Sequence, residues 1–103
     1  MICGIDPGLS GGITFINSEF FNVLPMPIST LELANKKTRY INILRLTELF
    51  IQRNGLTSCY IEKQQAMPKQ GLSSTFKTGF GYGLLLGITN IYFNEVVEVR
   101  PQE

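Results

Sequence analysis

The sequence predicts an α/β fold in which a mixed sheet packs against two helices. Three short runs of β-branched and aromatic residues follow one another near the start of the chain, separated by turn residues. Two longer segments with apolar residues at helical spacing come later, and a short strand-like run follows each of them. This order is typical of an antiparallel meander joined to parallel crossovers. At 103 residues, the chain has the size of one small domain, residues 1–103.

The meander is predicted from apolar runs that end at turns. The expected strands are residues 1–5, 13–16 and 20–24, with a turn at residues 9–12 and an end at Pro25 and Pro27. Residues 28–39 are polar and have no clear period, so we expect a loop there. A basic cluster in this stretch, Lys36, Lys37 and Arg39, is typical of a solvated loop.

The second half of the chain alternates between helices and strands. Residues 40–53 carry a broad apolar stripe at helical spacing, and Asn54-Gly55 ends it. Residues 58–61 form a fourth strand that ends on Glu62, and residues 96–99 form a fifth. Between them we expect a loop over residues 63–72 and a second helix, capped by Ser73 or Ser74 and ending near residue 92.

Composition excludes several classes of protein. Histidine is absent, which excludes Ser-His-Asp and Cys-His catalysis and any zinc site with histidine ligands. The longest apolar run, residues 80–93, has about 14 residues, and a membrane span needs roughly 20. No cationic signal region begins the chain, and two cysteines without metal-ligand spacing are typical of a reducing compartment. We therefore expect a soluble, cytoplasmic protein. Its net charge of +1 neither requires nor excludes a nucleic-acid partner.

Two carboxylates end strands that are expected to be central in the sheet. Asp6, the only aspartate, follows the first strand, and Glu62 follows the fourth. If these strands are parallel neighbours, both side chains lie at the edge of the sheet where ligands collect in α/β proteins. Oxygen ligands without imidazole favour Mg²⁺ or Mn²⁺, which could promote phosphodiester cleavage. Gly8, Gly11 and Gly12 would then leave room for a phosphate. The alternative is ordinary turn chemistry and a solvated glutamate.

The two cysteines provide a check on the strand register. Cys3 lies three residues before Asp6, and Cys59 lies three before Glu62. If the carboxylates are side by side in parallel strands, the thiols are also side by side, buried on the opposite face. The alternative is two unrelated cysteines in the core.

The segment after Glu62 combines cations, amides and hydroxyls at the start of a helix. Free N–H groups at such a position suit a phosphate, and Lys63, Lys69 and Lys77 flank it. Phe76 and Phe80 could stack on bases, although aromatic residues at this spacing are more often in a core. A glycine stripe follows, and its helix-propensity cost indicates close approach to the sheet or to the helix of a second subunit. The stripe is Gly79, Gly83 and Gly87.

Two stretches of the chain resemble the RuvC Holliday-junction resolvases, especially their phage and compact bacterial members. They are "GIDPGLSGGI" and "IEKQQAMPKQGLSSTFKTGFGYGLLLGI", and "VEVRPQE" matches the strand that follows the second helix. The resemblance covers nearly the whole chain. It implies an RNase H-like fold with strand order 3-2-1-4-5, and a homodimer that cuts four-way DNA junctions with a divalent metal and no nucleotide cofactor. It also implies the cytoplasm of a bacterial or phage-infected cell.

Carried over to this sequence, the resemblance implies that Asp6 and Glu62 are the first two catalytic metal ligands. It places the helix from Thr75 onward, and with it the glycine stripe, near the dimer interface. The implied DNA-binding residues are Lys63, Gln65, Lys69, Gln70, Ser73, Ser74 and Lys77.

The end of the chain departs from the family pattern. The remaining catalytic carboxylates of the family lie on a helix after the fifth strand, where this chain reaches Glu103, and Glu98 and Glu103 do not reproduce that motif. We therefore expect a form truncated at the carboxyl end, with weak or absent cleavage and exposed apolar surface on the sheet. A catalytically inactive DNA-binding or dimerisation module is the alternative. Asp6-Pro7-Gly8 is also similar to the first phosphate turn of actin-like phosphotransferases, but those enzymes need two lobes.

Overall fold

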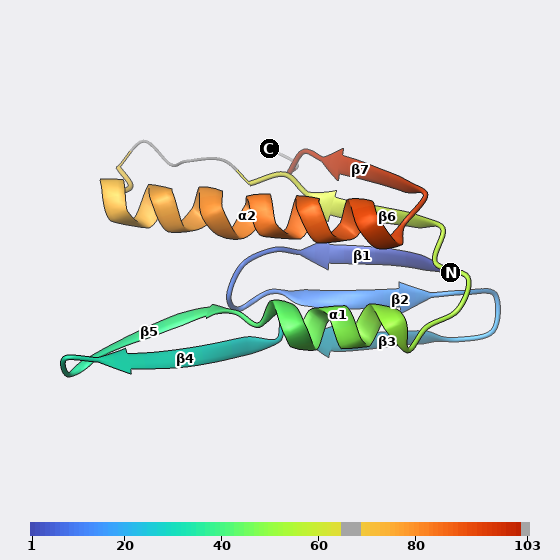
Figure 1. The fold of residues 1–103 in the computed structure, drawn as a ribbon. Helices are drawn as coiled ribbons and strands as arrows, with labels where there is room; N and C mark the ends of the chain where they lie inside the picture. Colours follow the sequence, from blue (N-terminus) through green and yellow to red (C-terminus); the bar gives the residue numbers. More distant parts are fainter. Residues whose placement is uncertain (65–68, 102–103) are drawn as a thin grey trace.

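The computed structural model of the chain describes residues 1–64 and 69–101 and has a mixed α/β architecture (Figure 1). A five-stranded mixed sheet, a two-stranded sheet and two helices make up the described fold. In chain order the elements are β1 (Ile2–Asp6), β2 (Gly12–Ile16), β3 (Phe21–Pro25), β4 (Ile28–Leu33), β5 (Lys36–Ile41), α1 (Ile43–Ile51), β6 (Ser58–Glu62), α2 (Leu72–Tyr92) and β7 (Glu95–Val99).

The large sheet has the order β3-β2-β1-β6-β7, which differs from the predicted order 3-2-1-4-5. The strands β1, β2 and β3 pair antiparallel, whereas β6 pairs parallel with both β1 and β7. The difference in order arises because β4 and β5, which the sequence did not predict, come between the meander and the first helix. The strands on the parallel side of β1 are therefore the sixth and seventh of the chain.

The β4–β5 hairpin replaces the loop that was predicted over residues 28–39. Its register pairs Leu33 with Lys36, so the connection is a two-residue turn of Ala34 and Asn35, both with positive φ angles of 51° and 64°. Two successive residues in this left-handed region are the mark of a type I′ turn, whose twist matches that of a hairpin. The basic cluster at Lys36, Lys37 and Arg39 therefore lies on a strand and not in an irregular loop.

The first helix is shorter than predicted. It begins at Ile43 because the side-chain carbonyl of Asn42 accepts a hydrogen bond of 2.9 Å from the Arg45 N–H, which is an N-cap. Tyr40 and Ile41, predicted as helical, belong to β5. The second helix begins one residue before the expected caps, with Gly71 at the N-cap position and no side-chain cap. Ser73 and Ser74 therefore lie inside its first turn.

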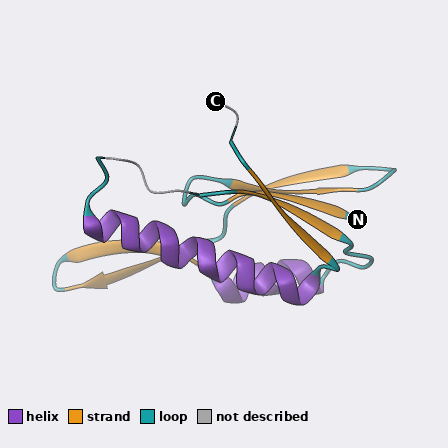
Figure 2. Cartoon of the chain, turned by 90° about the horizontal axis from the view of Figure 1, so that it is seen from above, coloured by secondary structure: helices purple, strands orange, loops and turns teal. Residues whose placement is uncertain are grey.

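The core lies between one face of the large sheet and the two helices. Figure 2 shows both helices on the same side of the sheet. Phe50 of α1 is at the centre of this layer, with ring centroids 6.1 Å from Phe15 of β2 and 5.2 Å from Phe93. The Arg53 guanidinium lies 3.9 Å from the Phe15 ring centroid. The buried hydrophobic residues are Cys3, Ile5, Ile13, Phe15, Met26, Ile41, Leu46, Leu49, Phe50, Cys59, Ile61, Leu85, Ile88 and Phe93.

The predicted cysteine register is confirmed. Cys3 and Cys59 are Cα partners across β1 and β6, and both side chains are fully buried on the helix side of the sheet. Both are free thiols. The hydrogen bond with Cys59, together with burial, raises the pKa of the Cys3 thiol well above its usual range. The Cys3 thiol therefore stays protonated, and both cysteines pack as small core residues.

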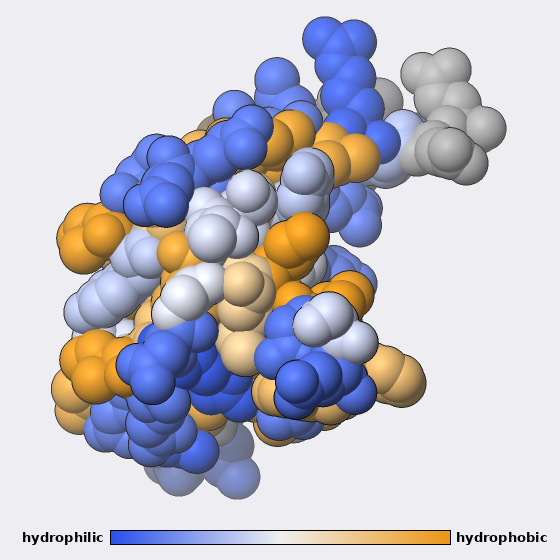
Figure 3. Space-filling model, turned by 90° about the vertical axis from the view of Figure 1, so that its right-hand side faces the viewer, coloured by the Kyte–Doolittle hydropathy of each residue, from blue (hydrophilic) through white to orange (hydrophobic). Residues whose placement is uncertain are grey.

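The opposite face of the large sheet carries apolar side chains that no described element covers. Because side chains alternate along a strand, the neighbours of the buried residues point to this face. They include Phe21 and Val23 of β3, which are 73% and 62% exposed. Ile2, Ile16, Tyr60 and Val99 are also exposed at such alternating positions. Apolar residues also reach the surface at the end of the molecule that Figure 3 displays.

Within the described residues, neither helix has the length and apolar character that a bilayer crossing requires.

Candidate metal and nucleic-acid site

Asp6 and Glu62 occupy corresponding positions at the carboxyl ends of two neighbouring parallel strands. Ile5 of β1 is the register partner of Ile61 of β6, and the two carboxylates are the next residues along each strand. Both isoleucines are buried beneath the helices, so the alternation of the strands turns Asp6 and Glu62 toward the other face. Both carboxylates are exposed. The sequence thus predicted their shared edge correctly.

The donor chemistry of this pair suits a hard divalent cation. Among the described residues, no side chain donates a hydrogen bond to either carboxylate or forms an ion pair with it. Two oxygen donors without a competing cation fit Mg²⁺ or Mn²⁺ in kind. The described part of the chain contains no group of three or more acidic, cysteine or histidine residues that could hold a metal. The described residues thus bring two carboxylates to this edge, fewer than a closed all-protein metal site would need.

Glu98 does not join this pair. It is the register partner of Ile61, so it lies on the helix side of the sheet, and its carboxylate accepts a hydrogen bond of 2.5 Å from the Tyr82 hydroxyl of α2. Burial, followed by this hydrogen bond and the charge of Glu98, raises the pKa of the Tyr82 phenol above its usual range. The interaction ties α2 to β7. Glu103 lies outside the described residues.

Two of the three glycines after Asp6 lie close to the chain's own backbone, and the predicted room for a phosphate stays a prediction. A Cβ at Gly11 would lie 2.0 Å from the backbone carbonyl oxygen of Asp6, and a Cβ at Gly12 would lie 3.0 Å from the carbonyl oxygen of Leu24. The chain's own backbone therefore requires glycine at position 11 and leaves little room for a side chain at position 12. Only Gly8 faces more open space, with no atom closer than 3.9 Å to a Cβ placed there.

The predicted DNA-binding residues that the structure describes lie at two places, the end of β6 and the start of α2. Lys63 follows β6 and is exposed, and its N–H donates to the Val99 carbonyl at 2.7 Å. Lys69 is also exposed. The Gln70 amide donates to the hydroxyls of Ser74 at 2.9 Å and Thr78 at 3.0 Å, so it braces the first turns of the helix. Gln65 lies outside the described residues. Exposed Ser73 and Lys77 complete the set.

Phe76 and Phe80 are not core residues, contrary to the more common outcome for aromatics at this spacing. They are 73% and 61% exposed, and their rings stack on each other with centroids 6.1 Å apart and an interplanar angle of 16°. Two exposed, stacked aromatic rings on one helix form a surface suited to flat partners.

The glycine stripe of α2 does not contact the sheet. Gly79, Gly83 and Gly87 are exposed, and a Cβ at any of them would meet no atom within 4 Å. Close approach to the sheet, one of the two explanations for the stripe, is therefore wrong. The other explanation, packing against the helix of a second subunit, stays a prediction.

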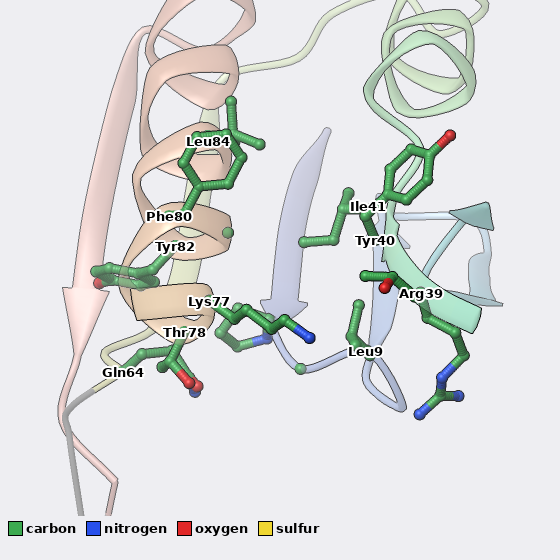
Figure 4. Close-up of a pocket in the computed structure, with 14 residues that line it drawn as sticks. Leu9, Arg39, Tyr40, Ile41, Gln64, Lys77, Thr78, Phe80, Tyr82 and Leu84 are labelled. Carbon is green, nitrogen blue, oxygen red and sulfur yellow. The ribbon is translucent and has the colours of Figure 1, made fainter. Parts of the chain in front are cut away.

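A cavity that sequence analysis missed adjoins the carboxylate edge. It has a volume of about 360 Å³ and lies between the β1–β2 loop, strand β5 and helix α2 (Figure 4). Its lining includes Leu9, Arg39, Tyr40, Lys77 and Phe80. Sequence reasoning assigned Tyr40 to a helix and so could not place it opposite α2.

Comparison with models of known protein families finds no match, and no curated protein shows significant similarity to the chain.

Proposed function

We propose that the chain is a metal-dependent endonuclease of the RuvC resolvase type, with an RNase H-like fold, that acts on branched DNA. The observation that carries the proposal is the placement of Asp6 and Glu62 at the same edge of the sheet, on neighbouring parallel strands. The sheet pairs, the exposure of both carboxylates and the lysines around the start of α2 support it. In this proposal Asp6 and Glu62 hold Mg²⁺ or Mn²⁺, which polarises the scissile phosphate.

The proposed activity is weak. Two-metal phosphodiester cleavage commonly uses more carboxylates than two, and the described residues supply no third acidic group at this edge. Glu98 is engaged by Tyr82 on the helix side of the sheet. A catalytically inactive DNA-binding or dimerisation module is therefore the second candidate.

A metal titration tests the carboxylate pair directly. Mg²⁺ or Mn²⁺ is added while the carboxyl resonances of Asp6 and Glu62 are followed by NMR. We expect both to shift or broaden together in the original protein and not in Asp6→Asn. Glu19→Gln, an exposed carboxylate in the turn between β2 and β3, is the matched control and should leave the titration unchanged. No response at millimolar metal would contradict the proposed metal site.

Cleavage of a labelled four-way junction separates the two candidates. With metal present, slow cleavage that is lost in Asp6→Asn and kept in Glu19→Gln supports the nuclease. Junction binding of equal affinity in all three proteins, without cleavage, supports the inactive DNA-binding module.

The partner of the proposed nuclease is a second copy of the chain, packed through α2. Three glycines in a helix cost roughly 1 kcal/mol each relative to alanine, and nothing within one copy explains them. Sedimentation of Gly83→Ala and Gly83→Leu tests this. In a monomer both substitutions stabilise the helix, because the space is open. In a dimer, leucine should lower the association constant and alanine should do so much less.

A further inference from the structure

The outer face of the large sheet, which is the face turned away from the helices, is apolar and carries only negative charge. Strand register and alternation determine which side chains point to it. Its charged residues are Asp6, Glu62 and Glu95, and none of the strand positions that point to this face is a lysine or an arginine. Its apolar side chains include Ile2, Ile16, Phe21, Val23, Tyr60 and Val97.

The β4–β5 hairpin also has one apolar face. Its register pairs Ser29 with Tyr40, Leu31 with Thr38 and Leu33 with Lys36, so these six side chains share one face, the ribbon face. Leu31, Leu33 and Tyr40 are 47%, 66% and 47% exposed. Figure 4 shows Ile41 turned toward α2 and Tyr40 turned away from it. The ribbon face is therefore open to solvent on the side away from α2.

Only the base of the hairpin packs on the rest of the described chain. Ile41 belongs to the core and Ile28 packs against it, whereas every residue from Thr30 to Lys37 is exposed. A two-stranded hairpin that packs on nothing is at best marginally stable in water. The exposed leucines therefore indicate that a further surface covers the ribbon face.

The hairpin is not placed to cover the outer face of its own sheet. It extends beyond the edge of the sheet in Figure 1, and in Figure 2 it lies on the same side of the sheet as the helices. There it forms a cavity with α2. A contact between a ribbon face and an outer face therefore requires two copies of the chain.

Charge favours this contact over the pairing of two identical sheet faces. Two outer faces packed on each other would bring the three carboxylates of each copy together without a cation, and like charges across an interface are destabilising. The hairpin has the opposite charge, since it carries Lys36, Lys37 and Arg39 and a single carboxylate, Glu32. An apolar, basic ribbon complements an apolar, acidic sheet in both respects.

We propose that the ribbon face of each copy packs on the outer face of a second copy, so that two chains exchange their hairpins. A two-fold axis then closes the pair with two identical contacts. A ribbon of two strands and six residues spans roughly 10 by 20 Å, so one contact is smaller than a specific interface and the second is needed. The contact uses neither α2 nor its glycine stripe, and it does not depend on the proposed nuclease activity.

Analytical ultracentrifugation of aspartate variants tests the inference. Every variant is made in a Gly83→Leu parent, in which association through the glycine stripe is weakened while the hairpin and the outer face are unchanged. We expect this parent to form a reversible dimer at about 100 μM protein. Leu33→Asp on the ribbon face and Val23→Asp on the outer face should each weaken the association roughly 100-fold or more, because each substitution occurs in both contacts.

Matched controls separate the contact from general effects of an added charge. Thr30→Asp places the same charge on the opposite face of β4, and Leu44→Asp replaces a leucine of α1 that is 71% exposed. Neither should change the association constant. Added salt should weaken association of the parent, and Lys36→Gln should reduce this dependence on salt. A thermal melt of each variant checks that it is folded.

A mixture of the two defective variants gives the sharpest test. Leu33→Asp keeps an intact outer face and Val23→Asp keeps an intact hairpin, so a mixed pair regains one of the two contacts. The other contact carries both substitutions, but a contact that is already lost cannot be weakened further. With one variant fluorescently labelled, we expect the mixture to associate roughly tenfold more strongly than either variant alone, and less strongly than the parent.

The other outcomes contradict the inference. A parent that stays monomeric at about 100 μM does so directly. If both variants weaken association and their mixture is not restored, each face pairs with its own kind and the exchange is wrong. It is also wrong if Thr30→Asp or Leu44→Asp weakens association as much as Leu33→Asp. The metal titration of Asp6 and Glu62, carried out on the Leu33→Asp variant, tests the nuclease proposal separately from this one.

Discussion

The substitution Gly11→Ala tests why glycines crowd the turn after Asp6. The new methyl group would lie 2.0 Å from the Asp6 carbonyl oxygen and 3.0 Å from that of Gly8. Ordinary carbon–oxygen contacts are well over 3 Å, so the backbone must move by roughly 1 Å or more. Both neighbours are main-chain atoms, which cannot rotate away as a side chain can.

The expected loss in the free energy of unfolding has two parts, the overpacking and a broken hydrogen bond. Overpacking costs about 1–3 kcal/mol. The turn is also held by a Gly11 N–H bond of 2.9 Å to the Gly8 carbonyl and a Met26 N–H bond of 3.1 Å to the Gly11 carbonyl. Losing one of them adds about 1 kcal/mol. We expect a total loss of about 3 kcal/mol in the free energy of unfolding, or roughly 12–24 °C in Tm for a domain of this size.

Urea unfolding followed by circular dichroism measures this loss, with Gly8→Ala as the matched control. A Cβ at Gly8 meets nothing closer than 3.9 Å, so that variant should stay within about 0.5 kcal/mol of the original protein. The reasoning is refuted if Gly11→Ala unfolds within about 1 kcal/mol of the original protein, or if Gly8→Ala loses as much stability as Gly11→Ala.

Three further predictions concern the hairpin turn, the link between α2 and β7, and the buried thiols. Ala34→Gly should raise the free energy of unfolding by about 0.5 kcal/mol, because glycine tolerates the positive φ of 51° better than alanine; equal or lower stability in urea would contradict this. Tyr82→Phe should lose about 1 kcal/mol at pH 7 with the hydrogen bond to Glu98. The pKa of Tyr82 is raised from its ordinary value of 10.0, so this contribution to stability is complete below pH 10 and is lost as pH rises through the raised pKa. If the two proteins differ by the same free energy of unfolding from pH 7 to above pH 11, the pKa is not raised. Cys3 and Cys59 should react with a thiol reagent at pH 8 only at the rate of unfolding, and fast labelling of the native protein would show that they are accessible.

The strands of the large sheet could be predicted because their sequences show which residues are buried and which are exposed. Buried positions in β1 and β6 are apolar, and equal spacing from each cysteine to its carboxylate fixed the register. That spacing placed Cys3 opposite Cys59, and with them Asp6 beside Glu62. The carboxylate edge of the candidate site was therefore readable from the sequence.

The hairpin could not be predicted in the same way. Most residues of β4 and β5 are exposed on both faces, so their strands show no alternation of apolar and polar residues. Their turn uses Ala34 and Asn35 in place of the usual Asn-Gly, so the strongest local signal was missing. The apolar residues at the end of β5 then merged with those of α1, and only the cap at Asn42 separates the two elements.

The part of the site that depends on tertiary placement was missed for this reason. Tyr40 lines the cavity only because it is in a hairpin strand, and Phe80 is exposed only because α2 extends beyond the sheet. No periodic pattern in the sequence carries that information, since both residues also fit an ordinary core.

The distribution of side chains around α2 leaves part of this helix uncovered by the other described elements. A helix that is apolar all round is normally buried all round. Here Leu85 and Ile88 pack on the sheet, while the glycine stripe and Phe80 remain exposed. In the proposed dimer, a second copy against the glycine stripe would cover one of these exposed faces and leave Phe80 open, so the sedimentation of the Gly83 variants tests the stripe without involving Phe80.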